Sequence, residues 1–477
     1  MTDETQSSKP EEICFQMRLN IPNLDQILPA PQFEPVQEVH HAHLVIDGLK
    51  SINLKIYHPD KDYLGDKLAR WMGDQEGDRA LTESIEVVSI NEREDVSTID
   101  FSESRDTTFS LSTAHYENGQ RYFLVGLDSV RLVFKPRERE TLPASEFYLN
   151  ATAKKIIEEM YAYHGFTPFH GEDVWKAHHY HGDYQNFGSV QYRLDYHFYS
   201  RKSPATDTYV IHKEPRLLIQ HENLPESDVL HHANLICALL SFYAQERISF
   251  DFARIHLPEH TVTITRRTEE VIPRKGMRLW HLDFHGKIFD LLRSVDYQVI
   301  SPKSDFVIRL IDKYNLCYLV SGETEFLILF NILEQLRNDS GGKEKERDKY
   351  RFIPPDKEVD EAIQARIREI APMVDESERA IFLEQAPRQY LNLKRKPMHD
   401  QFERLFQHYQ VNWSGAKVSF KAIKKLRDDI VHGGLLVGKH KKIEDANEVM
   451  RVLCGKLILQ MAGIPDIRFG KSPEPVA

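Results

Sequence analysis

The alternation of apolar and polar residues marks the first half of the chain as β-rich. From about residue 41, short runs such as "HLVIDGLKSINLKIY" and "VQYRLDYHFYS" alternate apolar with polar residues and are rich in β-branched and aromatic residues. Clusters of turn-forming residues separate these runs. The pattern predicts a mainly antiparallel β domain over residues 41–225, with one helix near 150–163.

After residue 225 the apolar residues recur with a helical period. Ser227 is placed to cap "DVLHHANLICALLSFYAQE", which is apolar on most sides and is therefore expected to be a buried helix. Further helices are predicted at about 281–295, 303–318, 323–337, 357–370, 375–386, 397–410, 419–432 and 443–462. We expect a helical middle region over 226–320 and a helical bundle over 321–465, interrupted by an exposed charged loop at 338–358. The predicted fold class is α+β.

The two ends of the chain differ from the rest in composition. Residues 1–40 contain seven acids, two bases and a proline-rich stretch, so we predict a flexible acidic arm, and residues 466–477 are taken as a tail. No run reaches the roughly 18 apolar residues that a membrane helix needs, and the acidic N-terminus is unlike a signal peptide. Four widely spaced cysteines favour reduced thiols. We expect a cytoplasmic protein without a membrane segment, disulfides or a cysteine metal site.

Charge is distributed unevenly along the chain. The 477 residues carry a net charge of −11, which argues against strong nucleic-acid binding by the chain as a whole. Between Arg388 and Lys442, however, the chain has 13 lysines and arginines but only four acids, so the net charge of this segment is +9 and that of the remainder is −20. The segment is either a solvated helical surface or a site for phosphate groups.

Within the basic segment, "KKLRDDIVHGG" forms the end of the helix predicted over 419–432. Ser419 can cap its start and Gly433 can end it. At about 100° per residue, Arg427 falls among the apolar positions of this helix. A guanidinium keeps its charge, so its burial calls for a carboxylate partner, a subunit interface or a bound phosphate.

His432 and Asp428 lie one turn apart on the same helix. The Asp428 carboxylate is therefore placed to orient the His432 ring for proton transfer. An ideal helix separates Arg427 from His432 by about 140°. Within one chain they meet only if the arginine bends round or the helix unwinds at Gly433, whereas a two-fold dimer can bring two such helix ends together.

One histidine, one arginine and a basic surface suit the cleavage of RNA by its own 2'-hydroxyl group. His432 would act as base or acid, and Arg427 would offset charge on the phosphorane. No metal or other cofactor is needed, because the nucleophile is already beside the phosphorus. The expected backbone contacts are Lys421, Lys424, Lys425, Lys439, Lys441 and Lys442.

The segment "LRDDIVHGG" resembles the R-x4-6-H motif of HEPN ribonucleases, in which a polar residue such as Asp428 commonly follows the arginine. The order of a β-rich region, a middle portion and a helical end is similar to that of ApeA-like anti-phage defence proteins. The resemblance is specific over roughly 320–465, vaguer over 80–320, and does not extend to the first 80 residues. It implies an endoribonuclease, latent until triggered, that acts as a homodimer on host RNA, often tRNA, in abortive infection. A β-rich sensing or regulatory domain would then receive a phage-derived trigger.

Two other interpretations remain open. The Arg-to-His spacing is unspecific, since Arg216 with His221, Arg274 with His281 and Arg278 with His285 also match it. In the first interpretation the Arg427–His432 motif is not catalytic, the helical domain only dimerises or binds nucleic acid, and the N-terminal half recognises a partner.

The second interpretation is a metallohydrolase, although no HExxH spacing is present. It would use a histidine- and acid-rich cluster made of His164, His170, Glu172, Asp173, His178, His179, His181 and Asp183.

Overall fold

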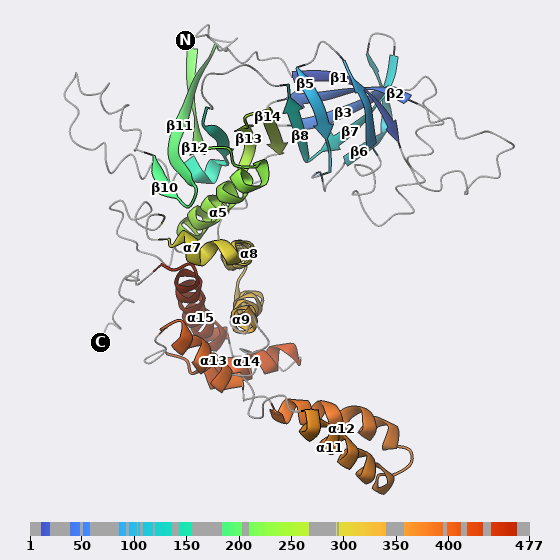
Figure 1. Ribbon diagram of the computed structural model, residues 1–477, viewed down its shortest axis with the longest axis vertical. Helices are drawn as coiled ribbons and strands as arrows, with labels where there is room; N and C mark the ends of the chain where they lie inside the picture. Colours follow the sequence, from blue (N-terminus) through green and yellow to red (C-terminus); the bar gives the residue numbers. More distant parts are fainter. Residues whose placement is uncertain are drawn as a thin grey trace, which may run out of the picture. The chain divides into compact units, whose positions relative to one another are not determined.

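The computed structural model divides into two compact units, one mainly of strands and one of helices (Figure 1). The residues that it describes are 11–19, 39–47, 51–57, 85–91, 95–102, 104, 108–117, 120–135, 143–154, 184–202, 209–266, 292, 295–339, 357–394, 398–411, 417–432 and 440–464. The first unit comprises Met1–Leu240, Arg247–Ile272 and Phe284–Arg293, and the second comprises Ser241–Glu246, Pro273–Asp283 and Ser294–Ala477. The predicted α+β class, with a β-rich first part and a helical last part, is confirmed.

A six-stranded antiparallel sheet forms the start of the first unit. Its order is β4 (Ile85–Ile90), β1 (Glu11–Leu19), β2 (Val39–Asp47), β3 (Ser51–Tyr57), β7 (Gln120–Leu127) and β6 (Thr108–Glu117). Alternate residues face one side, so that Ile13, Leu44, Leu54 and Val125 form a buried row across four strands. The alternation seen in the sequence is therefore the inner and outer face of this sheet.

The prediction of a flexible arm over residues 1–40 was wrong for residues 11–19. These residues form β1, which lies between β4 and β2 and buries Ile13, Phe15 and Met17. The alternation in "EICFQMRL" is the signal for this strand, but the surrounding acids and prolines outweighed it. Residues 1–10 and 20–38 lie outside the described residues.

An eight-stranded antiparallel sheet completes the first unit. Its order is β10 (Gln185–Phe187), β11 (Val190–Lys202), β12 (Tyr209–Gln220), β9 (Ser145–Leu149), β13 (Phe250–His256), β14 (Thr261–Arg266), β8 (Ser129–Phe134) and β5 (Val96–Asp100). β5 and β8 also pack against the six-stranded sheet, since Val96, Ile99, Val130 and Leu132 belong to the same apolar core as Ile13 and Leu44.

The prediction of a helical middle region over 226–320 was right only in part. Its first part is helical, as expected, in the buried helix α5 (Glu226–Ala244), but β13 and β14 follow as a hairpin that pairs with β9 and β8. This hairpin is stabilised by pairing with β8 and β9, two strands from earlier in the sequence. The local pattern of apolar residues cannot reveal such long-range pairing. Of the helices predicted at 150–163 and 281–295, residues 150–154, 292 and 295 are described, and of these residues 151–154 and 292 are helical.

Helix α5 spans the eight-stranded sheet. At its first residue, Glu226 accepts two hydrogen bonds from Arg131 of β8, at 2.8 and 2.6 Å. Six residues later the buried His232 ring contacts Phe187 of β10, at 6.4 Å between centroids. The helix therefore contacts strands from both parts of this sheet.

The second unit is a helical bundle whose boundary lies earlier than predicted. The described helices are α7 (Tyr297–Ile300), α8 (Ser304–Leu316), α9 (Gly322–Asp339), α11 (Lys357–Ile370), α12 (Arg379–Lys394), α13 (Met398–His408), α14 (Phe420–Val431) and α15 (His440–Met461). α8, α9 and α15 pack together, and α13 and α14 pack against α9. Because α8 shares the core of α9 and α15, the bundle does not begin at residue 321 as the sequence suggested.

Two remaining predictions concern the linker and the membrane. Of the charged loop predicted at 338–358, residues 338–339 belong instead to the end of α9 and residues 357–358 to the start of α11, while 340–356 lie outside the described residues. None of the helices in the described ranges is long and apolar enough to cross a membrane.

Candidate functional site

The candidate site is the C-terminal end of α14. The Ser419 side chain accepts a hydrogen bond from the Ala422 amide at 3.3 Å and caps the start of the helix, as predicted. Phe420 lies in the bundle core, with its ring 4.6 Å from that of Phe402 on α13. Buried residues thus anchor one face of α14, and its other face carries the charged side chains.

Arg427 is half-buried, as its place among apolar positions required. Its side chain is 30% exposed, its guanidinium carbon lies 5.8 Å from the ring centroid of Phe330 on α9, and its Nη1 atom donates to Asp428 at 3.2 Å. The aromatic face and the carboxylate both favour the cation. Among the described residues no other hydrogen-bond acceptor contacts the guanidinium, which therefore retains donors that a phosphate group can use.

The predicted contact between the Asp428 carboxylate and the His432 ring is not formed. Asp428 bonds Arg427 instead, and His432 follows the last helical residue, with its backbone N–H donating to the Asp428 carbonyl oxygen at 3.0 Å. The adjacent guanidinium competes for the carboxylate, and the backbone at His432 leaves the helical conformation with ψ 13°. His432 is exposed, and it makes no hydrogen bond with Arg427.

Five of the six predicted backbone-contact lysines are described and exposed. Lys421, Lys424 and Lys425 lie on α14, and Lys441 and Lys442 lie in the first turn of α15. Lys439 and Gly433 lie outside the described residues. The bundle therefore exposes several cations on the helix of Arg427 and on the next helix.

A buried polar cluster between α9 and α15 was missed by the sequence reasoning. Asn447 donates to the Gly322 carbonyl oxygen at 2.9 Å and to the Glu325 carboxylate at 3.2 Å. The Nε atom of Arg451 lies 2.6 Å from the same carboxylate. The sequence signal that could have revealed this cluster is the presence of polar residues on the apolar faces of the helices predicted at 323–337 and 443–462. The cluster holds the two helices in register and does not include the α14 residues.

Replacing Glu325 with Gln should change how stability depends on pH. Burial raises the pKa of the Glu325 carboxyl above its ordinary value of 4.5, although Arg451 and the Asn447 hydrogen bond oppose the shift. A raised pKa means that wild-type stability is lost as the pH rises above about 4.5 and through the folded-state pKa. The stability of Glu325→Gln relative to wild type should therefore increase over this range, by at most about 1.4 kcal/mol per pH unit. Urea unfolding between pH 4 and pH 8 measures it, and parallel pH profiles for the two proteins would contradict it.

The competing Arg–His pair of the first unit has a structural explanation. Arg216 donates to Asp195 at 3.0 Å and to Glu146 at 2.7 Å, while the His221 ring contacts the Ser145 hydroxyl at 3.2 Å. This arginine thus cross-links strands β11, β12 and β9. The pairs Arg274 with His281 and Arg278 with His285 lie outside the described residues.

The proposed metal cluster cannot be placed, since residues 155–183 lie outside the described residues. In the ranges that the structure does describe, no three histidine, cysteine or acidic side chains are grouped as metal ligands.

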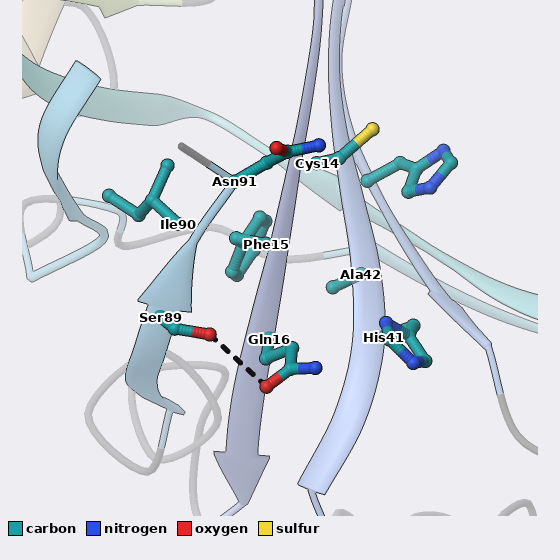
Figure 2. Close-up of a pocket in the computed structure, with 9 residues that line it drawn as sticks. Cys14, Phe15, Gln16, His41, Ala42, Ser89, Ile90 and Asn91 are labelled. Atoms are coloured by element: carbon teal, nitrogen blue, oxygen red, sulfur yellow. Dashed lines mark hydrogen bonds between the residues drawn. The ribbon is translucent and has the colours of Figure 1, made fainter. Parts of the chain in front are cut away.

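A small polar cavity lies on the six-stranded sheet, where β4, β1 and β2 meet (Figure 2). Its volume is about 200 Å³, and its polar lining includes Cys14, Gln16, His41 and Ser89. Ser89 donates to Gln16 at 3.1 Å. The volume is below the roughly 300 Å³ of ordinary ligand pockets, so the cavity suits a single side chain or small polar group rather than a nucleotide.

Comparisons of the chain with family models, with curated proteins and with solved structures find no match.

Proposed function

We propose that this protein is a metal-independent endoribonuclease of the HEPN type, with its active site at the end of α14. The observation that carries the proposal is Arg427, a cation held half-buried between Phe330 and Asp428, followed five residues later by the exposed His432. The exposed lysines of α14 and α15 add the phosphate contacts that RNA binding requires.

The reaction follows from the groups present. His432 in its neutral form accepts the proton of a 2'-hydroxyl group, and that oxygen attacks the adjacent phosphorus. The bond from phosphorus to the 5'-oxygen breaks, leaving a 2',3'-cyclic phosphate and a 5'-hydroxyl end. Arg427 stabilises the negative charge on the phosphorane through its remaining donors. Asp428 acts as a positioning residue for Arg427 rather than for His432.

Two copies complete the proposed site. One His432 cannot accept the first proton and donate the second in the same step, and Arg427 makes no hydrogen bond with His432 within one chain. A homodimer that brings two α14 ends together supplies a base from one copy and an acid from the other. The proposed setting is the cytoplasm, with host RNA such as tRNA as substrate and the β-rich unit as receiver of a phage-derived trigger.

A second candidate function is a non-catalytic nucleic-acid-binding or dimerisation protein. The lack of contact between Arg427 and His432 within one chain favours it, because a purely electrostatic surface needs no such contact. The two functions are distinguished by whether the protein produces new 5'-hydroxyl ends on RNA.

Sequencing of RNA 5'-hydroxyl ends from induced cells tests the proposal. Cells expressing wild type should contain new 5'-hydroxyl ends that are absent with His432→Ala. His408→Ala, which changes another exposed histidine of the bundle, is the matched control and should behave as wild type. The same set of ends with wild type and His432→Ala would favour the second function.

A further inference from the structure

Cys14 lies on the outer face of the six-stranded sheet, beside the small polar cavity of Figure 2. Along β1 the side chains of Ile13, Phe15 and Met17 face the core, so Cys14 and Gln16 face the opposite side. Cys14 is partly exposed, belongs to no disulfide and lines the cavity of about 200 Å³. A small molecule in solution can therefore reach this thiol.

A histidine of the neighbouring strand faces the same cavity. The register of β1 and β2 places His43 directly opposite Cys14, and both residues line the cavity. The side chains of such a pair lie on the same face of the sheet, with Cβ atoms about 4.5–5.5 Å apart. An imidazole at this position can accept the thiol proton and favour the thiolate, which is the reactive form of cysteine.

The His43 ring is held in place by a carboxylate and an aromatic ring. Its Nδ1 atom donates to the Glu12 carboxylate at 2.7 Å, and its centroid lies 4.7 Å from that of Tyr57. The Tyr57 hydroxyl lies 3.4 Å from the same nitrogen, and Lys55 lies 3.8 Å from the Glu12 carboxylate. Because the carboxylate fixes the proton on Nδ1, Nε2 remains as the proton acceptor. This is the division of roles found in a Cys–His–acid triad.

The other three cysteines are protected by burial. Cys237, Cys317 and Cys454 are at most 4% exposed. Burial raises the pKa of the Cys237 thiol to about 12, and it also raises the pKa values of the Cys317 and Cys454 thiols. A thiol that keeps its proton is a poor nucleophile. Cys14 differs from all three in its exposure, in its imidazole neighbour and in the cavity beside it.

The cavity indicates which kind of electrophile fits. Its polar lining includes Gln16, His41, Ser89 and Asn91, and none of its described lining residues is a lysine, an arginine or an acid. A group that enters it should therefore be small, polar and uncharged. Exchange with a disulfide needs only a thiolate and room for one half of the disulfide. The strands β1 and β2 supply the first, and the cavity supplies the second.

We propose that Cys14 is a thiol–disulfide exchange site for low-molecular-weight disulfides, with His43 as its base. His43 takes the thiol proton on Nε2, the Cys14 sulfur attacks one sulfur of the disulfide, and a new S–S bond forms as the old one breaks. The leaving thiolate takes the proton from His43, and the attached half occupies the cavity. One thiol and one disulfide are present before and after the step, so no further oxidant is needed. The site belongs to the β-rich unit and stands whether or not the chain cleaves RNA.

Intact-mass spectrometry of the native full chain treated with 2-hydroxyethyl disulfide, a neutral polar disulfide, tests the proposal. Wild type should gain one adduct, mapped to Cys14, and Cys14→Ser should gain none over the same time. His43→Gln should slow the reaction about tenfold at pH 7, where an ordinary thiol is only a few per cent ionised. The difference should shrink towards about pH 10, where thiols ionise without a partner. His41→Gln changes another histidine of the same cavity, so it is the matched control and should react as wild type.

Two further measurements keep the result interpretable. Circular dichroism establishes that each variant is folded, and in urea wild type should gain four adducts, because all four cysteines are then accessible. Three outcomes would overturn the proposal. They are an adduct on a buried cysteine instead of Cys14, a reaction no faster than that of a short unstructured cysteine peptide, and equal rates for His43→Gln and wild type at pH 7.

Discussion

Replacing His432 with Ala should lower the rate of RNA cleavage by purified protein about 10²- to 10⁴-fold, the usual contribution of a general acid or base. His432 is exposed at the end of α14, so its removal leaves the bundle core intact. The measurement is the single-turnover cleavage rate of a labelled RNA in the presence of EDTA, with binding measured separately. Loss of cleavage with unchanged binding is the expected pattern, and His408→Ala should cleave as wild type.

Arg427→Ala should lower the same rate about 10²- to 10³-fold, as expected for loss of a group that stabilises transition-state charge. Arg427→Lys should recover little of it, because an ammonium group cannot reproduce the fork of donors or the contact with Phe330. Asp428→Asn keeps the size of the side chain but removes its charge, so it affects cleavage only through the position of Arg427. Its cleavage rate should therefore fall less than that of Arg427→Ala. Equal cleavage rates for wild type and Arg427→Ala would exclude the proposed role.

Phe402→Ala should destabilise the helical unit by about 3–5 kcal/mol, the usual cost of removing a buried aromatic side chain. Phe402 is fully buried, and its ring lies 4.6 Å from Phe420, 6.3 Å from Phe330 and 6.3 Å from Phe406. Through Phe420 and Phe330 this ring supports both the start of α14 and the aromatic face under Arg427. The variant should therefore also lose cleavage activity.

Urea unfolding followed by the helical circular dichroism signal measures the stability of Phe402→Ala. Met373→Ala is the control, since that side chain is 84% exposed and its loss should change stability by less than about 0.5 kcal/mol at protein concentrations where the chain is monomeric. A similar unfolding midpoint for Phe402→Ala and wild type would show that this aromatic cluster does not hold the bundle together.

The sequence predicted the helical unit more closely than the β-rich unit. Helix α14 begins after its predicted cap Ser419 because capping and periodicity are local properties. β1 and β13 were missed because their stability depends on partners far away in the sequence, β2 and β4 for the first strand and β9 for the second. Long-range pairing, not local propensity, decided these strands.

The candidate site was predicted in part. The half-buried position of Arg427 followed from its place in the apolar stripe, but the Phe330 ring that lies beside it comes from another helix and could not be named from the sequence. The sequence also could not show that the Asp428 carboxylate bonds Arg427 rather than His432. It depends on where the last turn of α14 ends, and helix ends are set by tertiary contacts as well as by local residues.

The most direct test of the central claim is the chemistry of the RNA ends that the purified full-length protein produces in EDTA. Cleavage by wild type should give 2',3'-cyclic phosphate and 5'-hydroxyl ends, and neither should appear with His432→Ala. Products with 5'-phosphate ends, or cyclic phosphate ends that persist unchanged with His432→Ala, would contradict the assignment of the active site to the end of α14.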